Sequence, residues 1–173
     1  GMDYLFGPAF RLSDGFCSIK RGAKGKVCFV EGGSRKMIVI GKEHVAGILD
    51  KGMKPAAVCD SGETVVFETR DCYDDSVVSE EQPLGDKENP IENPATGPLF
   101  VKGALAGDVL KVEILDIQVR DWAVMRSSSV YGVFHEDFSE RTARIFKLDG
   151  EDGEFSFDGK LNLKLDPMIG VIG

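Results

Sequence analysis

The chain has 173 residues, with 21 Lys and Arg against 29 Asp and Glu, which gives a formal net charge of -8. This charge repels phosphate backbones and anionic lipid surfaces, so neither nucleic acid nor a membrane surface is an expected partner. No apolar run is long enough to cross a bilayer, and the first residues lack the basic and apolar regions of a secretory signal. With 42% hydrophobic residues, the composition is typical of a soluble globular domain.

The four cysteines, Cys17, Cys28, Cys59 and Cys72, are far apart in the sequence. None belongs to a C-x-x-C pair, the spacing found in thiolate zinc sites and thioredoxin-like redox motifs. We therefore expect reduced thiols and a cytoplasmic protein.

The first predicted elements are two strands, residues 26–31 and 35–41, which could form a hairpin around Gly32-Gly33. Residues 1–40 are predicted to be an extension, containing such a hairpin packed on a main β domain of residues 41–173. A further strand is expected from Val65 to Arg70.

The stretch from Asp74 to Pro98 lacks apolar alternation and is rich in acidic residues and proline, so it is predicted to be a long loop. Loops of this length are uncommon in compact domains unless they have a function or are disordered. This segment is therefore a candidate part of a site.

The remaining elements are also strands. Apolar residues alternate from Val109 to Ile117, another strand runs from Arg141 to Leu148, and residues 127–138 contain at most a short helical turn. Asp158-Gly159 separates two alternating runs and accepts the positive φ angles of a type I′ turn, which predicts a hairpin over residues 155–165. Short strands separated by turns indicate an all-β fold, a β-sandwich or jelly-roll-like domain.

The last six residues, Met168 to Gly173, are almost wholly apolar, whereas chain ends are usually polar. We expect this run to be buried against something, so that the chain is either truncated or completed by a partner.

Three blocks of sequence resemble the acetamidase/formamidase family. The central block is Asn93-Pro94-Ala95-Thr96-Gly97-Pro98, followed by Val101-Lys102-Gly103-Ala104 and Gly107-Asp108-Val109-Leu110. Upstream, Val66 to Cys72 is similar to the V-F-E-T-x-D-C strand end of the family, and downstream Pro167 to Gly173 is similar to its P-M-I-G-V-I-G segment. The resemblance extends from about His44 to Gly173, and the first forty residues match no recognised pattern.

The resemblance implies hydrolysis of short linear amides to carboxylate and ammonia, with water activated by a bound divalent metal, zinc or calcium. Typical members continue into segments with H-G-G-N-M-D, G-D-x-H-A and G-D-G-E motifs, which this chain lacks. Since His, Asp and Glu are natural metal ligands, we expect this chain to hold only part of the site.

Asp71 is the first candidate for a catalytic residue and metal ligand, because it lies where a strand enters a loop. Strand alternation places Asp71 on the face of Phe67 and Thr69, with Glu68 and Arg70 opposite, so Asp71 and Glu68 should not converge on one site while the strand stays regular. The alternative is that the Asp71 side chain simply caps the following turn.

Asn93, Thr96 and Gly97 are the candidate substrate-binding residues. A loop bounded by prolines can present backbone N–H groups and short polar side chains to a small carbonyl compound. The structural alternative is an Asx-Pro turn that links two strands. Cys72 has no nearby base that would activate it, and His44 and His135 are isolated in the sequence, so none of the three is a candidate.

The leading hypothesis is therefore an amide hydrolase that acts on a small amide, either as a homo-oligomer or with a completing C-terminal chain. The alternative is a non-catalytic β-sandwich scaffold or split-gene subunit that needs a partner.

Overall fold

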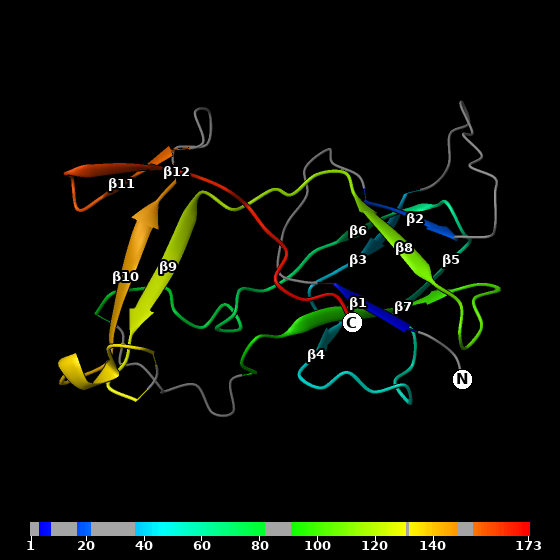
Figure 1. The fold of residues 1–173 in the computed structure, drawn as a ribbon, viewed down its shortest axis with the longest axis horizontal. Helices are drawn as coiled ribbons and strands as arrows, with labels where there is room; N and C mark the ends of the chain where they lie inside the picture. The colour runs from blue at the N-terminus through cyan, green and yellow to red at the C-terminus, as the bar shows by residue number, and fades with distance from the viewer. Residues whose placement is uncertain (1–3, 8–16, 22–36, 82–90, 131, 149–153) are drawn as a thin grey trace.

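The computed structural model describes residues 4–7, 17–21, 37–81, 91–130, 132–148 and 154–173 (Figure 1). For the first two ranges it describes strand pairing only. These residues contain β-strands and a single 3-10 turn, which confirms the all-β prediction. The elements are β1 (Tyr4–Gly7), β2 (Cys17–Arg21), β3 (Ile38–Ile40), β4 (Val45–Ala46), β5 (Ala57–Cys59), β6 (Thr64–Phe67), β7 (Ala95–Val101), β8 (Leu110–Ile114), β9 (Trp122–Ser127), η1 (His135–Asp137), β10 (Thr142–Lys147), β11 (Glu154–Phe157) and β12 (Leu161–Lys164).

Two four-stranded sheets share the main core. One has the order β3-β6-β2-β8, and in the other β7 pairs with β1, β4 and β5. Val65 of β6 and Ile40 of β3 pack with Cys59 of β5 and with Leu99 and Val101 of β7, all of them buried. The pairs β3/β6 and β5/β7 are parallel, so both sheets are mixed rather than purely antiparallel.

Strands β9 to β12 form a second group at the opposite end of the molecule from most of β1–β8 (Figure 1). β9 pairs with β10 and β11 pairs with β12, both antiparallel. Phe146 of β10 joins the two hairpins, because its ring lies 5.5 Å from that of Phe155 and 5.4 Å from that of Phe157, measured between centroids.

The predicted turn at Asp158-Gly159 is confirmed. The two residues have φ angles of 60° and 67°, and Lys160 N–H donates to the Phe157 carbonyl at 3.3 Å. Strand pairing starts one residue later than a two-residue turn would allow, at Phe157 and Leu161. The helical turn expected within residues 127–138 is also present, as η1.

The predicted loop from Asp74 to Pro98 is wrong at its C-terminal end, because β7 begins at Ala95. Thr96, Leu99 and Val101 are buried, and β7 has strands on both sides, so packing and pairing override the local turn signal of Gly97-Pro98. Of the predicted N-terminal hairpin, residues 26–31 and Gly32-Gly33 lie outside the described residues, whereas β3 lies within the predicted second strand.

Candidate active site

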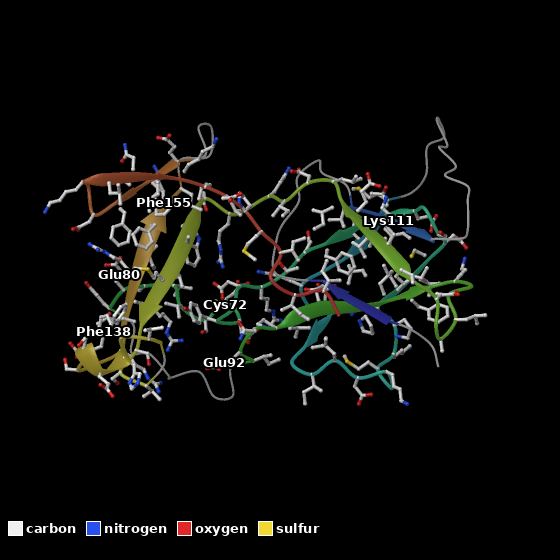
Figure 2. All side chains as sticks on the ribbon, in the orientation of Figure 1. Cys72, Glu80, Glu92, Lys111, Phe138 and Phe155 are labelled. Carbon is white, nitrogen blue, oxygen red and sulfur yellow. The ribbon has the colours of Figure 1, made fainter. Side chains whose placement is uncertain are left out.

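A cavity of about 630 Å³ lies between the segment that follows β6 and the segment that leads into β9. Cys72, one of its lining residues, lies between the two groups of strands (Figure 2). The volume falls in the range of about 300 to 1,000 Å³ that is usual for small-molecule sites. The lining residues are Lys42, Glu68, Thr69, Asp71, Cys72, Tyr73, Asp75, Gln118, Val119, Arg120, Trp122, Ala123, Val124, Leu148 and Leu165.

Asp71 forms a side-chain turn at the edge of this cavity. Its Oδ1 accepts hydrogen bonds from the N–H groups of Tyr73 and Asp75, both at 2.9 Å. In return, Asp71 N–H donates to Oδ1 of Asp75 at 3.0 Å. The structure thus shows the capping role considered as the alternative for Asp71, and it places the carboxylate in the cavity as well.

Arg120 pairs with both carboxylates. Its Nη2 donates to Asp71 Oδ2 and, at 3.3 Å, to Asp75 Oδ1, while its guanidinium lies 4.0 Å from the ring centroid of Trp122. Lys42 Nζ contacts Asp75 Oδ2 at 3.0 Å. Burial alone would raise the pKa of Asp75, but the hydrogen bond from Asp71 N–H and the positive charges of Lys42 and Arg120 hold this pKa below its ordinary value.

Glu68 differs from the other two carboxylates of the cavity. Among the described residues, its side chain has no ion pair or hydrogen bond. Glu68 and Asp71 were expected to stay apart only while the strand remained regular, and this condition is not met, because β6 ends at Phe67. Both residues therefore line the same cavity.

A metal ion does not fit Asp71 as the described residues are arranged. Asp71 Oδ1 already accepts two backbone hydrogen bonds and its Oδ2 is paired with Arg120. A divalent ion at this carboxylate would lie beside the guanidinium charge. Within the part of the chain that the structure describes, no three His, Cys, Asp or Glu side chains form a group that could hold a metal.

The predicted substrate-binding residues support the segment behind the cavity and are not among its lining residues. Thr96 Oγ1 donates to the Glu68 carbonyl at 3.0 Å, and Asn93 N–H donates to the Cys72 carbonyl at 2.9 Å. Gly97 N–H donates to the His44 carbonyl at 2.9 Å. Thr96 and Asn93 thus fix the backbone of two cavity residues.

Sequence reasoning missed Lys42, Arg120 and Trp122. Arg120 lies 49 positions from Asp71, and Lys42 lies 33 positions from Asp75, so no local motif links them. The Cys72 thiol, for which the sequence offers no nearby base, has a pKa raised by burial and by the charge of Asp71.

Comparison with known families identifies the chain. A sequence model of the Acetamidase/Formamidase family matches residues 49–173. The chain belongs to this family. This confirms the resemblance found in the motifs around Asp71 and Asn93.

Two solved structures of acetamidase/formamidase proteins share the fold. An acetamidase from Bacillus halodurans is 41% identical with a TM-score of 0.73, and the match covers 78% of this chain and 45% of that one. A recombinant predicted acetamidase/formamidase from the thermophile Thermoanaerobacter tengcongensis is 35% identical with a TM-score of 0.72, and the match covers 78% of this chain and 44% of that one. The chain thus spans less than half the length of either structure. No curated protein matches the sequence.

No helix among the described residues is long and apolar enough to cross a membrane.

Proposed function

We propose that the protein acts in the hydrolysis of short linear amides to a carboxylate and ammonia. The observation that carries this proposal is the cavity of about 630 Å³, lined by charged residues in a chain of the acetamidase/formamidase family. Its walls contain the V-F-E-T-x-D-C residues Glu68, Asp71 and Cys72, so one of the family blocks builds the cavity itself.

Asp71 is proposed to orient the catalytic segment. It closes the turn to Asp75 and accepts from Arg120, which together fix the chain that follows β6. Asn93 and Thr96 are proposed to aid substrate binding by holding the backbone of the cavity residues Cys72 and Glu68, and Gly97 by holding His44, two positions from the cavity residue Lys42.

Activation of water by zinc or calcium is a separate hypothesis. It requires Asp71 to exchange Arg120 for the ion, and we derive no step through it. Metal content of the purified protein, measured by mass spectrometry after incubation with zinc or calcium and dialysis, tests it. Stoichiometric metal that is lost in Asp71→Asn would support Asp71 as a ligand, and equal retention by both proteins would contradict that role.

The proposal also includes a cytoplasmic protein and either a homo-oligomer or a completing chain. Met168 and Val171 of the apolar C-terminal run are 68% and 62% exposed, which favours contact with another surface. The same exposure supports the second candidate function, a non-catalytic β scaffold that acts only as a subunit.

The decisive experiment measures ammonia release from formamide and acetamide. The 173-residue chain is assayed alone and after co-expression with the part of the Bacillus halodurans acetamidase that it does not match. In at least one of the two preparations, we expect more ammonia than the Bacillus halodurans fragment releases by itself. Release by the chain alone would rule out the scaffold function, and no release in either preparation would contradict the proposed activity.

A further inference from the structure

We infer that Glu68 is the proton-transfer group of the cavity, an inference that rests on the proposed function. The first observation is that the three carboxylates of the cavity differ in their ion pairs and hydrogen bonds. Asp71 and Asp75 are held by Arg120, Lys42 and backbone N–H groups, whereas Glu68 has a side chain without partners among the described residues. A carboxylate that exchanges protons needs an oxygen that is not already paired.

The second observation is the environment of Glu68. Its backbone is fixed at two points, since its N–H donates to the Ile40 carbonyl at 2.9 Å and its carbonyl accepts from Thr96 Oγ1 at 3.0 Å. Next to it, Thr69 Oγ1 is buried and has no hydrogen-bond partner in the part of the chain that the structure describes. Buried hydroxyls normally have a hydrogen-bond partner, often a water molecule. The cavity wall beside Glu68 therefore offers a hydrogen bond to a polar ligand or to water.

The chemistry requires only water and the amide. The Glu68 carboxylate takes a proton from water as the water oxygen bonds to the carbonyl carbon and the carbonyl π pair moves to its oxygen. The resulting carboxylic acid gives this proton to the amide nitrogen, the carbonyl re-forms and the C–N bond breaks. A carboxylic acid and ammonia leave, and Glu68 is a carboxylate again. No group is oxidised or reduced.

The test compares Glu68→Gln, Glu68→Asp and Glu92→Gln in the preparation that releases ammonia. Gln has the shape of Glu but cannot take the proton, so we expect kcat to fall about 100-fold or more with little change in KM. Glu68→Asp keeps the carboxylate and should recover part of kcat. Glu92 is an exposed glutamate outside the cavity, and its variant should match the wild type. Wild-type kcat in Glu68→Gln would overturn the inference.

A second measurement separates failure of this inference from failure of the proposed function. Carboxyl carbons of Glu68 and Glu92 in the full chain are followed by NMR while acetamide is added, which requires binding but no turnover. We expect the chemical shift of the Glu68 carboxyl carbon to change in a saturable way and that of Glu92 to stay constant. If no preparation releases ammonia, the proposed activity fails. If acetamide does not change the carboxyl carbon chemical shift of Glu68, the role assigned to Glu68 fails, whether or not the preparation is active.

Discussion

At the scale of single residues, the charge of Asp71 controls the chemistry of the neighbouring thiol. Burial raises the pKa of Cys72, and the negative charge of Asp71 raises it further, so little thiolate is present near neutral pH. In Asp71→Asn the Oδ1 acceptor of the turn is kept while the negative charge is lost. The pKa of Cys72 should therefore fall, and at any pH below it the thiolate fraction should rise.

We expect iodoacetamide to alkylate Cys72 about threefold faster in Asp71→Asn than in the wild type at pH 8, since half a pKa unit changes the thiolate fraction about threefold. Peptide mass spectrometry resolves each cysteine. Cys59 is an internal control, because burial and then the charges of Glu63 and Asp60 raise its pKa to about 11, and it should react slowly in both proteins. An unchanged rate at Cys72 would contradict the role given to Asp71.

The capping role of Asp71 was the alternative to a catalytic or metal-binding role, because short polar side chains at strand ends commonly bond to the next turn. The sequence pattern placed Glu68 on the opposite face from Asp71, because alternation was extended past Phe67, where the strand in fact ends. The cavity brings in Lys42 and Arg120 from 33 and 49 positions away, and such pairs depend on the tertiary fold.

At the scale of elements, the segment after β6 connects the two groups of strands. Asp71 and Asp75 pair with Arg120, the guanidinium of Arg126 lies 4.8 Å from the ring centroid of Tyr73, and Glu80 Oε1 accepts from Ile145 N–H at 2.6 Å. Their partners lie in or just before β9 and in β10. Side-chain contacts in one short segment therefore hold the β9–β10 hairpin to the first sheets.

Arg120→Leu should lower the free energy of unfolding by about 2 kcal/mol, because it leaves the partly buried Asp71 carboxylate without its charged partner and leaves Asp75 with Lys42 alone. Urea denaturation measures the change. Arg144→Leu is the matched control, since Arg144 pairs with Asp158 and both side chains are about half exposed, so its loss should cost less than about 1 kcal/mol. Equal losses in the two variants would show that Arg120 does not join the two groups of strands.

Local turn chemistry predicted the β11–β12 hairpin, because Asp158 and Gly159 are residue types that adopt positive φ angles without help from tertiary contacts. The same reasoning failed at Gly97-Pro98, where local turn signals lie inside β7. Pairing of β7 with β1, β4 and β5 decides this strand, and the parallel β5/β7 pair joins residues about forty positions apart. Register of that kind has no local signature in the sequence.

At the scale of the whole molecule, the family and a homo-oligomer or completing chain were predicted from the sequence, whereas the surface of contact was not. The family blocks form backbone turns and part of the cavity wall, and each is a short contiguous motif that can be recognised in the sequence. An assembly depends on which apolar surfaces remain uncovered, which only the structure shows. The connection between β9 and β10 is such a surface, with Val130, Val133, Phe134 and Phe138 exposed.

If the homo-oligomer proposal holds, this connection is a strong candidate for the contact, because Val133 and Phe134 are 92% and 70% exposed. Replacing both by Asp should shift the chain to monomer in sedimentation velocity, while unfolding changes by less than about 0.5 kcal/mol because neither side chain is packed. Val109→Asp, at a 73% exposed site before β8, is the control and should leave the association unchanged. A monomeric wild type would contradict the homo-oligomer, and an oligomeric double variant would place the contact elsewhere.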